Sequence, residues 1–230
     1  SFMADSGTGY WSDESAFSIS YDRGVCWNQP ALIDTDIDYI ADTVVNGACG
    51  EIYVATVNGP DTYECCDCDS VWRSNDDGDT YLRIWCDRLR GDYNQGTEWA
   101  VMDVPPEQTD EVSTLYMADL GTRTIYYATY GGLCGWDSRS TGLDYIVDIS
   151  VLEDTIVYVL DRDGSVVKST NHARRWTSPE DSKVTDDSGE EARSIEAYGD
   201  YVLVGGDMGD VTYSSDAGES YSALDDIGDG

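Results

Sequence analysis

The sequence predicts an all-β fold built from repeated antiparallel sheets. Short runs rich in β-branched and aromatic residues recur along the chain, glycine-bearing turns follow them, and one turn pattern returns five times. The runs cover residues 51–56, 124–129, 155–160 and 201–205, and helical periodicity is missing. Runs of this composition, bounded by turn signals, are typical of strands. Because they lack an alternating polar face, we expect them to be inner strands buried on both faces.

The repeated turn has the pattern Ser-x-Asp-x-Gly-x-x-aromatic. An aspartate side chain accepts hydrogen bonds from backbone N–H groups of its own turn, and glycine supplies the positive φ that the turn needs. The closing Trp or Tyr is expected to pack beneath the hairpin. Complete copies are Ser20, Asp22, Gly24, Trp27; Ser74, Asp76, Gly78, Tyr81; and Ser214, Asp216, Gly218, Tyr221.

Two degraded copies lie between the complete ones. The copy Ser169, Asn171, Trp176 has Asn in place of Asp and Ala in place of Gly. The copy Ser138, Gly142, Tyr145 has Ser in place of Asp. The spacing of the five copies brackets the roughly 40–45 residues of a four-stranded propeller blade.

The flanks of the turns complete the prediction of a blade. A second strand enters each turn, as in residues 70–73 and 165–168, and another short apolar strand lies upstream, as in residues 38–42 and 145–149. We therefore predict a single β-propeller domain over residues 1–230, with about five blades of four antiparallel strands. Residues 222–227 resemble the opening strand of a further blade. They are expected to close the ring with the N-terminal strand, unless the chain is a piece of a longer propeller.

The repeated pattern resembles the Asp-box family, also called bacterial neuraminidase repeats, which occurs in sialidases, xyloglucan-cleaving glycosidases, sortilin-type receptors and a photosystem assembly factor. The resemblance covers most of the chain as repeats. It implies that each box lies between the third and fourth strands of a blade, at the outer rim. It also implies that the boxes are folding elements and not catalytic ones.

The catalytic groups of sialidases are not matched in this sequence. Sialidase chemistry requires three arginines, a Tyr–Glu pair and an acidic Asp, and none of the five prolines stands in the Arg-Ile-Pro context of the first arginine. Asp119, Asp161 and Asp207 follow strand runs and are candidates for a glycosidase pair, but nothing marks two of them as partners. His172 is the single histidine, which leaves nucleophilic triads without support. We predict no catalytic residues.

The charge of the chain limits its partners. There are 46 acidic and 13 basic residues, and the formal net charge is −33. This charge argues against binding to nucleic acids and to anionic membranes, because both require a positive surface. The sequence contains no run of 18 apolar residues of the kind that spans a membrane. Three explanations of the acidity stay open: aspartates in tight turns, a surface adapted to high salt, and carboxylates that bind cations.

The seven cysteines favour disulfides over a metal site. Cys68 and Cys86 lie at similar distances on either side of the second box, which predicts a disulfide between the strands that flank it. Cys26 and Cys49 form the second predicted pair, and the odd count leaves one thiol, for which Cys134 is the candidate. Disulfides persist in oxidising compartments. We therefore expect an extracellular, cell-surface or virion location.

Calcium is the one cofactor that the sequence suggests. Asp161 and Asp163 stand one residue apart before a glycine turn, as at the start of a calcium loop, without the distant bidentate Glu that would complete the loop. Aromatic residues in loops, such as Trp136, offer a carbohydrate or protein contact surface.

The sequence favours a non-enzymatic module over an enzyme. We expect a structural or partner-binding (adhesion) propeller that meets a protein partner and could assemble into a homo-oligomer. The alternative is a glycan-binding or glycan-hydrolysing propeller of the glycosidase type.

Overall fold

The structure is a computed structural model that describes residues 14–19, 28–34, 39–46, 50–57, 69–87, 100–106, 114–133, 135–185 and 189–224. The chain forms two compact units, Ser1–Leu89 and Arg90–Gly230. In the described residues the regular structure is β-strand, apart from one short 3-10 turn, η2 (Tyr130–Gly132). No helix in this part of the chain is long and apolar enough to cross a membrane.

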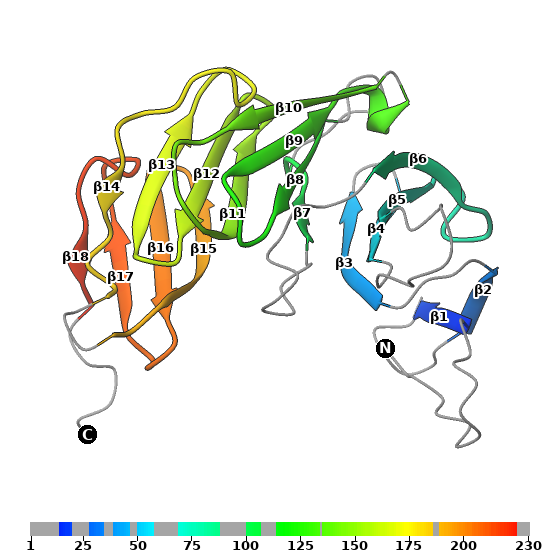
Figure 1. Cartoon of the computed structure of the whole chain (residues 1–230), viewed down its shortest axis with the longest axis horizontal. Coiled ribbons are helices and arrows are strands. Elements are labelled where there is room, and N and C mark those ends of the chain that lie inside the picture. The colour runs from blue at the N-terminus through cyan, green and yellow to red at the C-terminus, as the bar shows by residue number, and fades with distance from the viewer. Residues whose placement is uncertain are drawn as a thin grey trace. The chain divides into compact units, whose positions relative to one another are not determined.

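The N-terminal unit contains a strand pair and one four-stranded sheet (Figure 1). Strands β1 (Glu14–Ile19) and β2 (Asn28–Asp34) pair antiparallel, with Ile19 opposite Asn28. The first predicted box, Ser20 to Trp27, therefore connects two antiparallel strands, although its own residues lie outside the described ones. The four-stranded sheet has the order β3 (Tyr39–Asn46), β4 (Glu51–Val57), β5 (Asp69–Ser74) and β6 (Leu82–Asp87).

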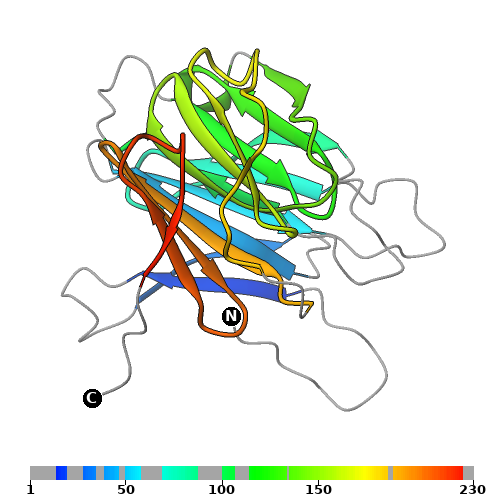
Figure 2. The ribbon, with the colours of Figure 1, turned by 90° about the vertical axis from the view of Figure 1, so that its left-hand side faces the viewer.

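The C-terminal unit consists of three four-stranded antiparallel sheets. They lie side by side, with the β11–β14 sheet between the other two (Figure 1). In Figure 2 the β15–β18 sheet, in orange to red, lies in front of the β11–β14 sheet. The strands are β7 (Ala100–Asp103), β8 (Leu115–Asp119), β9 (Thr124–Ala128), β10 (Trp136–Ser140), β11 (Ile146–Glu153), β12 (Ile156–Asp161), β13 (Ser165–Ser169), β14 (Glu180–Asp181), β15 (Ala192–Tyr198), β16 (Tyr201–Gly206), β17 (Val211–Ser214) and β18 (Ser222–Ala223).

The all-β propeller prediction is confirmed: the four complete sheets are meanders of four neighbouring antiparallel strands, which is the architecture of a propeller blade. Two details of the prediction are wrong. The run 124–129 forms the third strand, β9, because the residues before it already form the second strand, β8. Residues 222–223 do not open a new blade; they form β18, the outermost strand of the last sheet, where Ala223 lies opposite Thr212.

The core of the C-terminal unit lies between neighbouring sheets, and β12 shows how it forms. Side chains alternate between the two faces of a strand. Val157 and Val159 pack toward the β7–β10 sheet, in a cluster that includes Tyr116 and Ile125. Tyr158 and Leu160 pack in a second cluster against β15 and β16. Residues 157–161 of β12 are all buried, as expected for a strand covered on both faces.

Carboxylates on the first strands link successive sheets. Asp103 on β7 accepts a hydrogen bond from Val104 N at 2.7 Å and one from Val151 N, on β11, at 2.7 Å. Asp148 on β11 repeats this pattern: it accepts a hydrogen bond at 2.8 Å from Ile195 N, which lies on β15 in the next sheet. Each of these aspartates thus supplies an acceptor to the backbone of the sheet that follows it.

The box turns lie between the third and fourth strands, where the Asp-box resemblance implied. In the turn that joins β17 and β18, Ser214 Oγ donates to Asp216 Oδ1 at 2.7 Å and accepts from Gly218 N at 2.8 Å. Asp216 Oδ1 also accepts from Ser220 N at 2.9 Å. The turn between β5 and β6 repeats these bonds with Ser74, Asp76, Gly78 and Thr80.

Glycine in the box is required by the backbone and by the neighbouring sheet. Gly218 has φ +86°, and a Cβ there would come within 3.1 Å of the ring of Tyr158. Tyr221, which closes this box, is 2% exposed and packs in the same cluster as Tyr158. The Tyr158 hydroxyl donates to Ala217 O at 3.1 Å, so the box is also bonded to the adjacent sheet.

The degraded copy at Ser169 keeps the turn with altered chemistry. Asn171 Oδ1 accepts from Arg175 N at 2.9 Å, in the way that Asp216 accepts from Ser220 N. Ala173 occupies the glycine position with φ +56°, a left-handed conformation that costs an ordinary residue about 1–2 kcal/mol. Its methyl group is fully buried in the cluster between the β7–β10 and β11–β14 sheets, which offsets part of that cost.

The degraded copy predicted at Ser138 is not a box turn. Ser138 lies in the middle of β10, opposite Tyr126, and Gly142 and Tyr145 belong to the connection between β10 and β11. The third and fourth strands of this sheet are joined by a different connection that contains η2. The pattern matched here by composition, because Ser, Thr and Gly also fill an ordinary connection between sheets.

The serine of a box should contribute measurably to stability. Ser214 is 1% exposed, and Ser214→Ala removes the acceptor of the Gly218 N–H group. An unsatisfied buried donor costs about 1–3 kcal/mol. Chemical denaturation should therefore show that loss for Ser214→Ala, while Ser215→Ala, at an exposed position of the same turn, changes stability by less than about 0.5 kcal/mol. Equal effects of the two substitutions would contradict the role of the Ser214 hydroxyl.

The carboxylate of the last box should make stability depend on acid. Hydrogen bonds from the Ser220 and Ser214 side chains and from Ser220 N lower the pKa of Asp216 from 3.8 to about 2. The contribution of the Asp216 carboxylate to the free energy of unfolding is thus fully present above the unfolded-state pKa, and it is lost as the pH falls through about 2. The difference in melting temperature between wild type and Asp216→Asn should be largest near pH 6 and shrink toward pH 2. Asp210→Asn, which removes the same charge from an exposed turn, is the matched control, and a pH dependence equal to that of the control would refute the prediction.

Candidate functional site

One end of the three C-terminal sheets carries a connected set of charged and aromatic side chains, which we call the turn face. It comprises the turns between second and third strands and the segments that lead into the first strands. Backbone hydrogen bonds connect these segments from sheet to sheet, for example from Ile146 N to Thr122 O at 2.8 Å and from Ala192 N to Arg162 O at 2.9 Å. The side chains of the turn face are Arg123, Asp144, Tyr145, Arg162, Glu191, Arg193, Asp207 and Met208.

Aspartates at the ends of the second strands hold this face in place. Asp161 Oδ2 accepts hydrogen bonds from Asp144 N at 2.8 Å and Tyr145 N at 2.9 Å. In the next sheet, Asp207 Oδ1 accepts a hydrogen bond from Glu191 N at 3.1 Å. Asp119, at the same position of β8, is fully buried. Asp119 and Asp161 thus occupy the same position at the end of their strands, whereas Asp207 lies one residue later, after Gly206.

The arginines of the turn face are exposed but ordered by ion pairs. Arg123 Nη2 lies 2.7 Å from Asp144 Oδ1, and Arg193 Nη2 lies 2.9 Å from Glu191 Oε2 and 3.3 Å from Asp207 Oδ2. Hydrogen bonds from Glu191 N and from Arg193 hold the pKa of Asp207 below its ordinary value. The side chain of Arg193 is still 54% exposed. Surface ion pairs of this kind add little stability, so their main effect is to restrict the arginine side chains.

Arg162 and Tyr145 form the aromatic part of the turn face. The guanidinium carbon of Arg162 lies 4.1 Å from the centre of the Tyr145 ring, within the range of a cation–π contact. In the next sheet Met208 is 73% exposed. Arginine, tyrosine and methionine are enriched at protein–protein interfaces. The turn face thus combines the residue types of an interface on ordered backbone.

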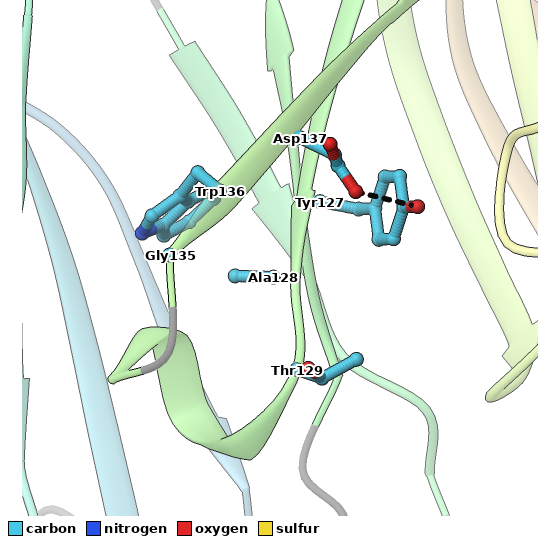
Figure 3. A pocket seen from close by; sticks show the side chains of 6 residues that line it. All are labelled: Tyr127, Ala128, Thr129, Gly135, Trp136 and Asp137. Carbon is cyan, nitrogen blue, oxygen red and sulfur yellow. Dashed lines mark hydrogen bonds between the residues drawn. The ribbon is translucent and has the colours of Figure 1, made fainter.

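A second candidate is a hollow at the β9–β10 hairpin, with a volume of about 220 Å³ (Figure 3). Its lining residues are Tyr127, Ala128, Thr129, Gly135, Trp136 and Asp137. The Tyr127 hydroxyl donates to Asp137 Oδ2 at 3.0 Å. Tyr127 is buried, whereas Trp136 is half-buried and the Asp137 side chain is 58% exposed. The hollow is therefore an open, mixed polar and aromatic site.

The predicted calcium ligands act as turn residues. Asp161 is 4% exposed, and both of its carboxylate oxygens accept backbone hydrogen bonds, Oδ1 from Asp163 N and Oδ2 from the two bonds described above. Asp163 accepts from Ser165 N at 2.9 Å. Within the described ranges, no three His, Cys, Asp or Glu side chains are grouped so that they could hold a metal ion. The same Asp-x-Asp-Gly sequence also builds tight turns, and calcium binding here stays a prediction.

The predicted Cys68–Cys86 disulfide is not formed. Cys86 is an exposed, free thiol on β6, and the strand register places Ser70 opposite it. Cys68 itself lies outside the described residues, as do Cys26, Cys49 and Cys134. Similar spacing around the turn does not make the two cysteines partners: without the bulge between Val71 and Trp72, Asp69 would lie opposite Cys86, and the bulge makes Ser70 its partner.

His172 lies in the degraded box and serves the packing between sheets. Its Nε2 atom is 3.0 Å from Asp154 Oδ2. Thr114 donates to the other oxygen of Asp154, and the Tyr116 hydroxyl donates to Asp154 O at 2.7 Å. Burial and the nearby Asp154 raise the pKa of Tyr116. Asp154 thus joins the β7–β10 sheet to the β11–β14 sheet.

Sequence reasoning missed the turn face, because its arginines occupy different positions in each repeat. Arg123 and Arg162 lie between second and third strands, whereas Arg193 lies on a first strand. The available signal was an aspartate at or just after the end of each second strand of the C-terminal unit, followed within a few residues by glycine. That signal marks the turns but does not show which side chains meet across sheets.

Comparison with known proteins identifies the fold. No protein-family model matches the chain, and no curated protein matches it in sequence. Among solved structures, it is similar to Ycf48 from Cyanidioschyzon merolae (TM-score 0.55, 15% identity, 91% of this chain and 66% of that one). It is similar to Saccharomyces cerevisiae Sqt1 (TM-score 0.55, 9% identity, 92% of this chain and 68% of that one).

A third similar structure is an ancestral GH74 enzyme, with TM-score 0.61 and 13% identity, over 93% of this chain and 28% of the enzyme. The chain thus spans about two thirds of the length of the Ycf48 protein and less than a third of the GH74 enzyme. Since these neighbours are β-propellers, the comparisons agree with the sheet order: the chain has the β-propeller fold.

The assignment of Asp161 as a turn residue can be tested against a calcium role. Asp161→Ala leaves two backbone N–H groups without their acceptor, which should cost about 1–3 kcal/mol in chemical denaturation. Adding calcium or a chelator should leave the melting temperature of the wild type unchanged. Asp163→Ala, at an exposed position, is the control. Stabilisation of the wild type by calcium, abolished in both variants, would instead establish a metal site.

Proposed function

We propose that this chain is a non-enzymatic Asp-box propeller module that binds a protein partner through the turn face. The observation that carries the proposal is the stacked pair of Arg162 and Tyr145, 4.1 Å apart, on the same end of the sheets as the exposed Met208. Arginine and tyrosine are among the residues that contribute most to binding energy in protein interfaces.

Ordering of the side chains before binding supports this function. The free-energy cost of binding is smaller when interface side chains are already restricted, because immobilising a flexible side chain costs about 0.5–1.5 kcal/mol. Arg123, Arg162 and Arg193 are each restrained by a carboxylate or a ring in the free protein. The turn face therefore suits a tight contact without a large conformational change.

Charge supports a protein partner over a nucleic acid or a membrane. The turn face holds three arginines and three carboxylates that pair with them or lie close by, Asp144, Glu191 and Asp207. The same turns also carry the exposed Asp163 and Asp210, so the face presents both charge signs but stays acidic, on a chain whose formal net charge is −33. A surface with both charge signs specifies a partner that also carries both.

The repeated aspartates argue against a glycosidase. A two-carboxylate mechanism needs side chains that reach a substrate. Asp161 and Asp207 instead accept hydrogen bonds from backbone N–H groups, and Asp119 is fully buried. The burial of Asp119 and Asp161 and the backbone hydrogen bonds of Asp161 and Asp207 are those of residues that hold the turns.

The proposal extends to the setting of the protein. The cysteine content of the chain favours an extracellular, cell-surface or virion location, and the turn face would serve there in adhesion or in assembly with other subunits. A homo-oligomer is one form that such an assembly can take. Membership of the Asp-box family is part of the proposal, supported by the hydrogen bonds of the three described boxes.

Photo-cross-linking from position 208 of the full chain would identify the partner in extracts of the source. Binding of the purified partner should then weaken at least about tenfold in Arg162→Ala and in Tyr145→Ala, the loss of more than 1 kcal/mol that marks interface hot spots. Glu219→Ala, at the exposed box end of the last sheet, is the control and should bind like wild type. Binding unaffected by the turn-face substitutions, measured by calorimetry on folded variants, would refute the proposal.

A further inference from the structure

The β15–β18 sheet differs from the two other sheets of the C-terminal unit in the burial of its second strand. β8 is buried along its whole length, and β12 is buried over residues 157–161. In β16, exposed and buried residues alternate from Tyr201 to Val204. Val202 and Val204 pack toward the β11–β14 sheet, so Tyr201 and Leu203 point to the opposite side of the sheet. In Figure 2 the sheet lies in front of the β11–β14 sheet, with this opposite side toward the viewer.

The strand register groups the side chains on this side of the sheet, which we call the outer face. Tyr198 lies opposite Tyr201, and Leu203 lies opposite Tyr213 on β17. Opposite residues of neighbouring strands share a face and are in contact range. Tyr198 is 83% exposed, Tyr201 59% and Leu203 45%. The residues of the outer face are Ser194, Glu196, Tyr198, Tyr201, Leu203, Gly205, Val211, Tyr213 and Ser222.

The preceding sheet shows what such a face packs against. β12 and β16 pair with their third strands in the same register relative to the box serine. Leu203 therefore occupies the position of Tyr158, and Val211 occupies the position of Val166. Tyr158 and Val166 are both buried in the cluster that joins their sheet to the β15–β18 sheet. The outer face thus repeats the positions at which one sheet packs on the next.

The composition of the outer face indicates a contact surface. An antiparallel sheet with one face in water normally carries polar residues on that face. Contiguous exposed apolar side chains instead mark sites of protein–protein contact. Among the residues of the outer face, Glu196 is the single carboxylate, although 46 of the 230 residues of the chain are acidic. Another strongly acidic chain would therefore meet less repulsion here than at a surface of average composition.

We propose that a second copy of this chain packs on the outer face, outer face against outer face, in a two-fold dimer. Among the described second strands of the C-terminal unit, β8 and β12 are already covered on both faces. The open sheet face that a second copy of this unit offers is therefore the same one. Pairing of identical patches produces closed two-fold dimers, the commonest oligomers. Sheets pack face to face with interdigitating side chains, and tyrosine rings pack against one another in offset or edge-to-face pairs.

The area of the outer face predicts a weak dimer. With two exposed tyrosines and their neighbours, the face can bury on the order of 500 Å² per copy, because a buried aromatic side chain contributes about 150–250 Å². The pair would bury about 1,000 Å², the smallest area expected of a specific interface. The dimer should therefore form at micromolar or higher concentrations and dissociate on dilution.

Sedimentation equilibrium of the full chain would test the dimer. The mass should rise from that of one chain toward that of two between about 1 and 500 μM. The dimer should be stronger at about 1 M than at about 0.1 M sodium chloride, because salt screens the repulsion between two acidic copies and strengthens apolar contacts less than it weakens ion pairs. A monomer over the whole range, or a dimer that dissociates in salt, would overturn the proposal.

Variants locate the contact on the outer face. Leu203→Glu adds a carboxylate to each copy and should weaken the dimer at least about tenfold. Tyr198→Ser, at the most exposed position, should also weaken it, and it decides the question should Leu203→Glu fail to fold. Leu133→Glu makes the same change at a leucine that is 55% exposed in the β9–β10 connection, and it should dimerise like the wild type. Equal dimerisation of the outer-face variants and Leu133→Glu would place the contact elsewhere.

Cross-linking identifies the occupant of the outer face. A photoreactive amino acid at position 198, in nitrogen-15-labelled protein mixed with unlabelled protein, should form cross-links between a labelled and an unlabelled chain. These cross-links should map to residues 194–213 of the second copy. Cross-links within one chain, or to a different protein from the source, would show another occupant and overturn the dimer.

The dimer uses a surface other than the turn face and does not depend on the proposed function. Arg162→Ala should leave dimerisation unchanged, and Leu203→Glu should leave binding of the turn-face partner unchanged. A monomeric chain that binds its partner through the turn face would refute the dimer alone. Loss of the dimer in Arg162→Ala would show that the two copies meet at the turn face and would overturn this pairing.

Discussion

Burial of both faces of the β11–β14 sheet is the constraint on which the C-terminal unit depends. A β-sheet alone leaves two faces in water, and β12 carries apolar side chains on both of them. Val157 and Val159 need the β7–β10 sheet, and Tyr158 and Leu160 need the β15–β18 sheet. Stacking of blades is the arrangement that supplies a neighbour on each side. The interblade bonds of Asp103 and Asp148 then fix the alignment of sheets that apolar packing alone would allow to slide.

The two ends of the sheets are stabilised by different chemistry, and this difference separates folding from function. At the box end, serine and aspartate side chains satisfy the backbone of their own turn, so the bonds are local. At the other end, Asp161 and Asp207 bond to segments that lead into first strands, and the arginines of the turn face pair across neighbouring segments. A surface built from such non-local contacts has ordered but exposed side chains. Exposed side chains on rigid backbone are what a binding site requires.

The β7–β10 sheet has no box turn between its third and fourth strands, and its hairpin connection differs from those of the two other sheets of the unit. A box turn is compact because its polar atoms are used internally. Where η2 and three glycines replace it, the strands are joined by a wider connection, and Trp136 and Asp137 border open space. The Tyr127–Asp137 bond and Arg139 balance the charge there without filling the hollow. Departures from local consistency in a repeat are often functional sites.

The sequence by itself determined the local features of this protein. The strand runs, the four-stranded repeat and the hydrogen-bonding turns at Ser74 and Ser214 follow from residues close together in the chain, where periodicity and turn chemistry act. Sequence reasoning failed where pairing partners are distant. Residues 124–129 and 155–160 are similar runs, but only the presence of β8 makes the first a third strand. Ser138 matched a box in composition, and its pairing with Tyr126 makes it a strand residue.

Only the tertiary structure decided the candidate sites. Arg162 meets Tyr145, and Arg193 meets Asp207, through the register of strands and the stacking of sheets. The same is true of the strand register that places Ser70 opposite Cys86. Composition limits which partners the charge allows, but the positions of exposed side chains depend on contacts between residues far apart in sequence. Those contacts form when the sheets bury their faces against one another, and no local pattern encodes them.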